Sequence, residues 1–149
     1  ADVDGTLTDG GMYVADSGEE FKKFNTKDGM GFKILISQGY KVGVISASHS
    51  KNTVIRRAEI LGLHYYYVGK GKKTDILEQW MQEMNIGYDQ VAYIGDDIND
   101  LEVIEKAGFT ACPADAVDIV KKKSDVILEK KGGDGCFREM VDRFFAITT

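Results

Sequence analysis

The sequence predicts an α/β protein: a doubly wound (Rossmann-like) parallel sheet with a projecting β-hairpin and no cap domain. Segments with the apolar character of buried strands alternate with segments of helical periodicity along most of the chain. Polar residues directly follow several strand segments, as they do where ligands bind at the edge of such a sheet. The 149 residues, 43% of them apolar, suffice for one domain with one core, and no stretch is long enough for a cap.

Turn and capping residues mark the boundaries of the expected elements. Asp16-Ser-Gly separates two short β-prone segments, which predicts a hairpin. Thr26 or Asp28 is suited to the N-cap of the first helix, and Gly62 to the left-handed position that ends the second. Continuous apolar runs predict buried parallel strands. The expected elements are a hairpin over 12–24, helices over 30–36, 48–61, 74–84, 99–106, 116–122 and 137–145, and strands over 41–46, 65–68, 91–94, 109–112 and 126–128.

Asp2 and Asp4 lie at the start of the chain, where a strand is expected to end. Alternate side chains of an extended segment point the same way, so the two carboxylates are expected to face one point. Such a pair favours a hard cation held by oxygen ligands, above all Mg²⁺ where phosphate is also present. A surface turn is the alternative interpretation of this motif alone. Only Ala1 precedes the pair, so we predict one domain over residues 1–149 with a truncated first strand.

Further polar residues follow the other expected strands. Ser46 ends one strand, Lys73 comes shortly after a second, and Asp96 follows a third. Because ligands bind beyond the carboxyl ends of parallel strands, these side chains are expected to meet the two leading carboxylates at one edge. The alternatives are a turn role for Ser46 and a solvated basic loop for Lys73.

Three motifs together resemble a known family: Asp2-Val-Asp-Gly-Thr-Leu-Thr, Gly95-Asp-Asp-Ile-Asn-Asp100 and Gly132-Gly-Asp-Gly-Cys-Phe-Arg-Glu139. The chain resembles the haloacid dehalogenase-like phosphohydrolases. Within them it is similar to the small capless branch that includes 3-deoxy-D-manno-octulosonate 8-phosphate phosphatase and the N-acylneuraminate or ketodeoxynononate 9-phosphate phosphatases. The same module forms the C-terminal domain of some acylneuraminate cytidylyltransferases. The resemblance extends to about Phe145.

The resemblance implies hydrolysis of a phosphate monoester through an aspartyl-phosphate. Asp2 would attack phosphorus as the nucleophile. Asp4 would protonate the departing alkoxide and then deprotonate the water that hydrolyses the intermediate. Ser46 would hydrogen-bond a phosphoryl oxygen, and Lys73 would neutralise charge on the nucleophile and on the transferring group.

A magnesium site is also implied. Asp2 and Asp96 would supply carboxylate ligands, and Asp4 would supply its backbone carbonyl. Asp97 and Asp100 are expected to orient the metal's water molecules or the loop around them.

The expected substrate is a phosphorylated 2-keto-3-deoxy sugar acid, with octulosonate 8-phosphate first and a 9-phosphate of an acylneuraminate or ketodeoxynononate second. Ser48 stands where the family commonly has Arg or Glu, which leaves the choice between them open. Arg56 and Arg57 are suited to bind a sugar-acid carboxylate, with a solvated helix face as the alternative. The expected substrate-binding residues are Thr26, Asp28, Ser46, Ala47, Arg56, Arg57, Lys73 and Asn99.

The resemblance further implies a homotetramer formed through the 12–24 hairpin and the 132–138 loop, in which a neighbour closes the active site in place of a cap. The net charge of −5 argues against a nucleic-acid partner, and no apolar run reaches membrane-spanning length. Cys112 and Cys136 have no zinc-site spacing, which indicates reduced thiols in a cytoplasmic protein.

Two functions from other classes compete with a phosphatase. A non-catalytic oligomerisation domain of an acylneuraminate cytidylyltransferase is consistent with the missing first strand, but it would not need Asp2, Lys73 and Asp96 together. A phosphoryl-accepting response regulator lacks the second acid at i+2 that hydrolysis requires, so we rank it last.

Overall fold

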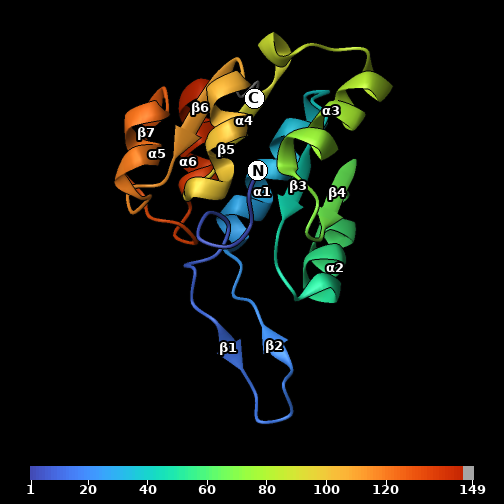
Figure 1. Cartoon of the computed structure of the whole chain (residues 1–149), viewed down its shortest axis with the longest axis vertical. Helices are drawn as coiled ribbons and strands as arrows, with labels where there is room; N and C mark the ends of the chain where they lie inside the picture. The colour runs from blue at the N-terminus through green and yellow to red at the C-terminus, as the bar shows by residue number, and fades with distance from the viewer. Residues whose placement is uncertain (146–149) are drawn as a thin grey trace.

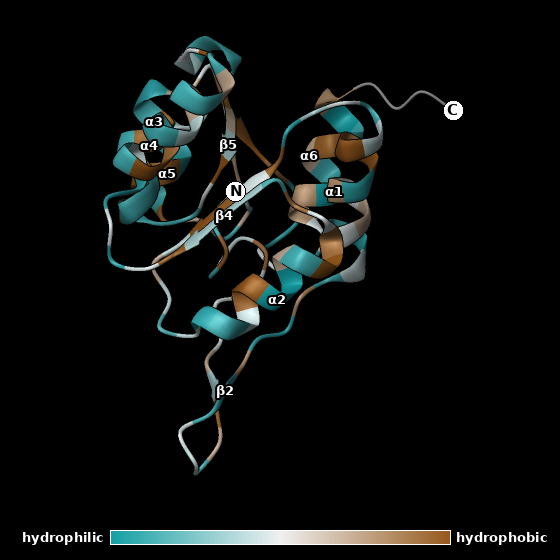
Figure 2. Ribbon diagram, turned by 90° about the vertical axis from the view of Figure 1, so that its right-hand side faces the viewer, coloured by the Kyte–Doolittle hydropathy of each residue, from teal (hydrophilic) through white to brown (hydrophobic). Residues whose placement is uncertain are grey.

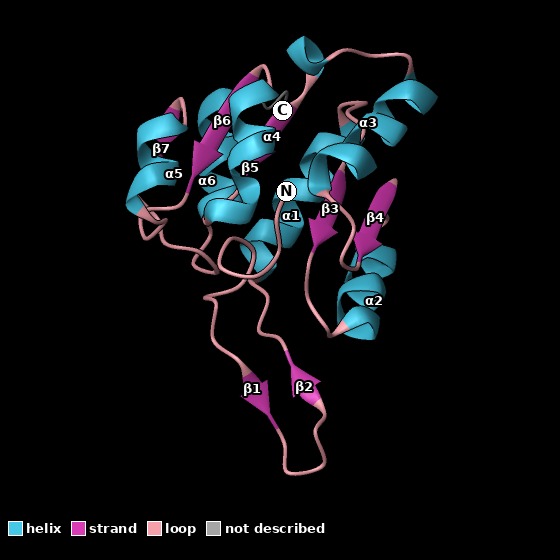
Figure 3. Cartoon of the chain, viewed as in Figure 1, coloured by secondary structure: helices cyan, strands magenta, loops and turns pink. Residues whose placement is uncertain are grey.

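The computed structural model describes residues 1–145; residues 146–149 of the predicted domain lie outside the described part of the chain. Helices and parallel strands alternate as predicted (Figure 1, Figure 3). The elements are β1 (Tyr13–Val14), β2 (Glu20–Phe21), α1 (Thr26–Ser37), β3 (Gly43–Ser46), α2 (Lys51–Leu61), β4 (Tyr65–Val68), α3 (Lys73–Met84), η1 (Tyr88–Gln90), β5 (Ala92–Ile94), η2 (Ile98–Asp100), α4 (Leu101–Lys106), β6 (Phe109–Cys112), α5 (Asp118–Lys123), β7 (Val126–Ile127) and α6 (Cys136–Phe144).

The first residues of the chain join two groups of parallel strands. β3 pairs with β4, and β5, β6 and β7 pair in that order. The carbonyl of Ala1 accepts a hydrogen bond from Ile45 N at 3.0 Å on β3, and Asp2 N donates to Ile94 O at 2.9 Å on β5. The strand-like order is therefore β4, β3, residues 1–2, β5, β6, β7, which places Asp2 at the centre of the sheet edge.

Helices cover both faces of the sheet, which confirms the doubly wound arrangement (Figure 2). On one face α1, α2 and α6 contribute to a core in which the rings of Phe32 and Phe137 stack with centroids 4.0 Å apart. On the other face α3, α4 and α5 bury Leu77, Val103 and Val120 against the strands. Among the described residues, no helix is both long enough and apolar enough to cross a membrane.

Two helix starts differ from the sequence-based expectation. Helix α1 has Asn25 as its N-cap, whose side chain accepts from Lys27 N at 2.8 Å, so neither Thr26 nor Asp28 takes this role. Helix α2 begins at Lys51 rather than at Ser48, because serine hydroxyls upstream accept from backbone N–H groups and hold the chain in successive turns. The expected helix end at Gly62 is confirmed by its φ of 74°.

The predicted hairpin projects from the body of the molecule (Figure 1). Tyr13 pairs with Phe21 in an antiparallel register between β1 and β2. Several large apolar side chains of this arm are exposed, including Met12 at 76% and Val14 at 56%. We define residues 12–24 as the arm.

Candidate active site

A buried lysine joins two of the strand-end carboxylates. Lys73, the first residue of α3, donates from Nζ to Asp2 Oδ1 at 2.6 Å and to Asp100 Oδ1 at 2.8 Å. All three side chains are almost fully buried, at 7%, 7% and 0% exposure. Burial opposes the charge on Lys73, but the charges of Asp2 and Asp100 raise its pKa above the usual value. The solvated-loop alternative for Lys73 therefore does not hold.

Asp100 organises the loop after β5. Its Oδ1 accepts from Lys73 and from the hydroxyl of Tyr93, and its Oδ2 accepts from the backbone N–H groups of Asp96 at 3.0 Å and Asp97 at 3.2 Å. Burial and the Asp100 charge raise the pKa of Tyr93 well above its usual value, so the phenol remains a donor. Asp97 caps the following turn by accepting from Ile98 N. Asp97 and Asp100 thus both accept hydrogen bonds from backbone N–H groups of the loop that follows β5.

Asp2 and Asp96 lie against each other across the sheet edge. The Thr6 hydroxyl is within 3.1 Å of Asp96 Oδ1 and 3.4 Å of Asp2 Oδ2. Burial raises the pKa of Asp2, and the Asp100 charge adds to this effect against the opposing Lys73. Burial, followed by the proximity of Asp2, raises the pKa of Asp96 to about 8. The closeness of the two buried carboxyl groups thus disfavours a negative charge on both at once.

These carboxylates are suited to a divalent cation. One oxygen each of Asp2, Asp96 and Asp100 lies within 4.8 Å of the others. Asp100 already accepts four hydrogen bonds, so Asp2 and Asp96 are the carboxylates with capacity for a metal. An all-oxygen donor set with more negative than positive charge fits a hard cation such as Mg²⁺.

The loop after Asp2 is packed against a glycine-rich segment of the same chain. A Cβ on Gly5 would lie 2.0 Å from Asp96 Oδ2, and one on Gly132 would lie 1.8 Å from Gly5 O. Gly133 N donates to Thr6 O at 3.0 Å. The start of the 132–138 loop therefore contacts the site of its own chain. The family resemblance had instead predicted that this loop reaches the site of a neighbouring subunit. A side chain at Gly5 would meet Asp96, and a side chain at Gly132 would meet the backbone of Gly5, so both positions favour glycine.

Asp4 points toward the arm. Its Oδ1 accepts from Lys22 Nζ at 2.6 Å, and the exposed fraction is 10% for the Lys22 side chain and 44% for Asp4. Asp4, Lys22, Ser48 and His49 contribute to the lining of an open cavity of about 240 Å³ between the arm and the β3–α2 loop. The carboxylate of Asp4 is not among the three acidic side chains whose oxygens lie close together.

Other predicted residues lie at the same sheet edge with weaker ties to the cluster. Ser46 ends β3, is 1% exposed, and accepts from Ser48 N at 3.1 Å, which is the turn role of its alternative interpretation. Ala47 and Asn99 are exposed in the loops that follow β3 and β5. No hydrogen bond within residues 1–145 joins these three side chains to Asp2 or Asp96.

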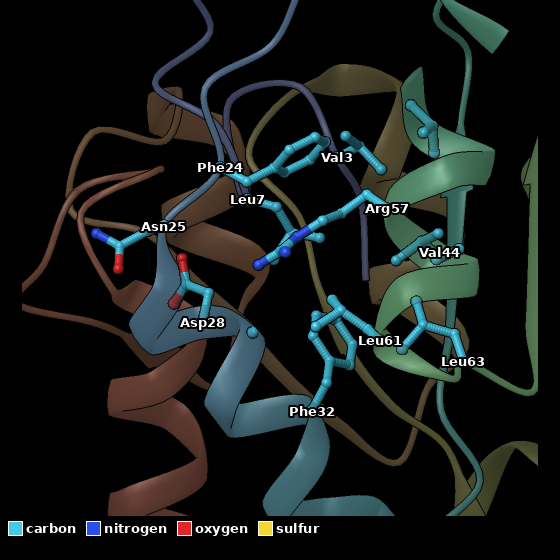
Figure 4. Close-up of a pocket in the computed structure, with 13 residues that line it drawn as sticks. Val3, Leu7, Phe24, Asn25, Asp28, Phe32, Val44, Arg57, Leu61 and Leu63 are labelled. Atoms are coloured by element: carbon cyan, nitrogen blue, oxygen red, sulfur yellow. The ribbon is translucent and has the colours of Figure 1, made fainter. Parts of the chain in front are cut away.

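The predicted substrate residues of α1 and α2 form a separate group (Figure 4). Asp28 and Arg57 line a small, mostly apolar pocket of about 20 Å³, and the Arg57 guanidinium lies 5.7 Å from the centroid of the Phe24 ring. Asp28 Oδ1 accepts from Arg138 N at 3.0 Å at the start of α6, and burial raises the pKa of Asp28 to about 6. Thr26 and Arg56 are exposed. The structure does not bring this group into contact with the buried carboxylates.

Known proteins resemble this chain over most of its length. A haloacid dehalogenase-like hydrolase profile matches residues 29–108. The 3-deoxy-D-manno-octulosonate 8-phosphate phosphatase of Escherichia coli is 35% identical over 141 residues, which are 95% of this chain and 74% of that protein. The chain belongs to the haloacid dehalogenase-like hydrolases.

Solved structures of this family superpose closely on the chain. A probable phosphatase from Pseudomonas syringae has a TM-score of 0.91 at 40% identity and covers 95% of this chain and 80% of its own. The octulosonate 8-phosphate phosphatase of Moraxella catarrhalis, solved with a magnesium ion, a phosphate ion and the sugar acid, has a TM-score of 0.89 at 34% identity, covering 93% and 79%. The expectation of a phosphoric monoester hydrolase is thereby confirmed.

Sequence reasoning missed three polar residues of this haloacid dehalogenase-like site: Thr6, Tyr93 and Lys22. Thr6 adjoins the Asp-Gly pair and could have been chosen from the motif alone. Tyr93 reads as an apolar strand residue, and only its hydroxyl contact with Asp100 distinguishes it. Lys22 has no local signal, because the hairpin rather than the motif brings it to Asp4.

Proposed function

We propose that the protein is a Mg²⁺-dependent phosphatase that hydrolyses the phosphate ester of a 2-keto-3-deoxy sugar acid. The substrate that we propose first is 3-deoxy-D-manno-octulosonate 8-phosphate. The observation that carries this proposal is the buried contact of Lys73 with Asp2, set beside Asp96 and Asp100. Relatives that span the chain bear the name of this activity, and one was solved with magnesium and the sugar acid.

The proposed reaction has two steps. In the first, a carboxylate oxygen of Asp2 forms a bond to phosphorus while the bond from phosphorus to the sugar oxygen breaks, and Asp4 delivers a proton to that oxygen. In the second, water attacks the aspartyl-phosphate, Asp4 takes its proton, and the Asp2 carboxylate is regenerated with release of inorganic phosphate. Lys73 neutralises charge near the nucleophile throughout.

We assign the cation to Asp2, Asp96 and the backbone carbonyl of Asp4. When bound, Mg²⁺ would lower the repulsion between the carboxylates and the phosphoryl oxygens. Asp100 and Asp97 hold the backbone from which Asp96 projects, so they preserve the position of that ligand.

The arm is the surface through which we expect a homotetramer to form. Large apolar side chains are exposed on it, and exposed apolar surface of this kind is typical of a protein–protein interface. These side chains are Met12, Tyr13, Val14 and Phe21. A neighbour placed there would also border the cavity that contains Asp4, which suits a site with no cap.

Phosphate release from a panel of substrates tests this function. The panel holds octulosonate 8-phosphate, N-acetylneuraminate 9-phosphate, ketodeoxynononate 9-phosphate and hexose phosphates, each with Mg²⁺ and with EDTA. Preference for octulosonate 8-phosphate supports the proposal. Preference for a 9-phosphate would keep the class of substrate but change the sugar acid, a choice that the uncharged Ser48 leaves open. No turnover of any keto acid by the folded protein contradicts the proposal and favours an assembly domain.

A further inference from the structure

The strongest unassigned contact outside the carboxylate cluster is the ion pair between the arm and the catalytic loop. Lys22 follows β2, and its Nζ lies 2.6 Å from Asp4 Oδ1. The lysine is the better buried partner, with a side chain 10% exposed. Lysine side chains are rarely buried to this extent without a defined partner, because desolvating an ammonium is costly. Lys22 and Asp4 are 18 residues apart in the sequence, and the hairpin of the arm brings them together.

The pairing leaves one oxygen of Asp4 available. Lys22 uses Oδ1, and no hydrogen bond within residues 1–145 engages Oδ2. A carboxylate tethered through one oxygen loses rotational freedom about its side-chain bonds, so its second oxygen is held in a narrow range of positions. Asp4 also borders the open cavity of about 240 Å³ between the arm and the β3–α2 loop, into which the leaving part of a substrate could extend.

The arm is attached to the same loop at a second point. The Tyr13 hydroxyl donates to Asp9 Oδ2 at 3.2 Å, and Gly11 N donates to Asp9 Oδ1 at 2.8 Å. The two ends of the arm are thus fixed to the segment that carries Asp2 and Asp4. A hairpin anchored on both sides presents Lys22 at a defined place, although the arm itself projects into solvent (Figure 3).

We propose that Lys22 is a positioning residue for the general acid: it holds the Asp4 carboxyl group so that its free oxygen meets the leaving group. The inference rests on the proposed function, because it gives Asp4 the proton-transfer role described there. Lys22 contacts the Asp4 carboxylate, not the backbone carbonyl of Asp4 that is assigned to the metal. Its contribution therefore concerns the two proton transfers of Asp4, the first of which is the transfer to the departing oxygen.

The dependence of the rate on the leaving group tests this inference. Lys22→Gln keeps a long polar side chain without the charge, and Lys22→Met keeps the apolar stem should Gln disturb the arm. Each is assayed on phenyl phosphate, whose leaving group needs a proton, and on p-nitrophenyl phosphate, whose leaving group departs readily without one. The value of kcat/KM reports the first step, in which the leaving group departs.

Both substitutions are expected to lower kcat/KM for phenyl phosphate by ~10-fold or more, a part of the 10²–10⁴ that general acid catalysis supplies. The loss on p-nitrophenyl phosphate is expected to be several times smaller. Lys22→Arg, which keeps the charge, should recover most of the activity on phenyl phosphate. Lys23→Gln is the matched control, because Lys23 is exposed and adjacent, and it should leave the ratio of the two rates unchanged.

Equal losses on both aryl phosphates, or failure of Lys22→Arg to recover activity, would overturn the positioning role. The proposed function has a separate readout in the parent protein. If the parent cleaves both aryl phosphates but no keto-acid phosphate, the substrate proposal fails while the Lys22 ratio still decides this inference.

Discussion

The ammonium of Lys73 lies 2.6 Å from Oδ1 of Asp2, although 71 residues separate the two along the chain. Lys73 begins the helix after β4, and Asp2 lies at the centre of the sheet edge, so the fold itself creates this contact. For Asp2 as the proposed nucleophile, this contact would orient the carboxylate before any substrate arrives and so lower the entropic cost of the reaction.

Asp2→Asn is expected to reduce phosphatase activity by at least about 10³-fold, because an amide cannot form the phosphorylated intermediate. The fold should persist, since burial already disfavours the charged form of Asp2 and raises its pKa. Steady-state turnover and thermal melting measure the two effects. Asp118→Asn is the control, because it makes the same substitution at an exposed residue of α5, and it should retain full activity. An active Asp2→Asn protein would exclude covalent catalysis by this residue.

Mg²⁺ is expected to stabilise the protein more at pH 8 than at pH 5. The folded-state pKa of Asp96 is raised to about 8 from 3.8, so without metal the folded protein holds a proton that the unfolded chain releases. Stability without Mg²⁺ is therefore fully present below the unfolded pKa and falls as pH rises toward 8. The cation replaces that proton and removes the loss. Thermal melting across this range, with Mg²⁺ and with EDTA, measures the difference.

Asp96→Asn provides the control for that pH dependence. The amide carries no titrating proton, so the loss of stability between pH 5 and pH 8 in EDTA should shrink, and so should the response to Mg²⁺. Activity should be lost as well, because a metal ligand is removed. A variant that keeps the parent's Mg²⁺ response would remove Asp96 from the metal site.

Tyr93→Phe is expected to lower both stability and turnover, because it removes the phenol that donates to buried Asp100. The loss of a buried hydrogen bond to a charged group costs about 1.5–3 kcal/mol of unfolding free energy. Turnover falls because Asp100 also orients Lys73 and the Asp96 backbone. Tyr88→Phe, which breaks a similar bond to Glu78 away from the site, should reduce stability only slightly and leave turnover unchanged. Equal turnover in both variants would exclude a role for Tyr93.

Gly132→Ala is expected to reduce activity, because its Cβ would lie 1.8 Å from Gly5 O and displace the loop after Asp2. Gly39→Ala separates this contact from backbone strain. Gly39 has a φ of 88° but no atom within 4 Å of the added Cβ, so this variant should lose about 1 kcal/mol of stability without losing activity. Melting and kinetics of the pair measure both effects. Full activity in Gly132→Ala would show that the loop tolerates displacement.

Phe21→Glu is expected to shift the assembly to smaller species, because a carboxylate on the arm would be buried at the proposed interface. Phe21 is 53% exposed in the single chain. Ile60→Glu serves as the control, since Ile60 is 64% exposed on α2, outside the arm. Light scattering after size-exclusion chromatography reports the mass of each. The same mass for both variants and the parent would place any interface elsewhere.

The sequence alone determined the fold class and the order of nearly all elements. Strand β4 at Tyr65–Val68 and strand β6 at Phe109–Cys112 were predicted to the residue, because continuous apolar runs between turn signals are local features. The predicted first residues of helices α1 and α2 were wrong by several residues. There, side-chain oxygens of Asn25, Ser46 and Ser48 accept hydrogen bonds from backbone N–H groups and so decide where the helix starts, and composition gives no ranking among such candidates.

The site divides in the same way. Asp2 and Asp96 could be chosen from the sequence because each follows a strand, and parallel strands end at one edge of the sheet. Lys73 also comes shortly after a strand, but only the family resemblance distinguishes it from the other lysines of its loop. Their partners could not be chosen: Tyr93 reaches Asp100, Gly132 meets Gly5, and Lys22 meets Asp4 only through the tertiary structure. The ends of strands follow from the local sequence pattern, so the sequence identifies the residues placed there. Contacts between distant loops depend on how the whole chain packs, so only the tertiary structure shows these partners.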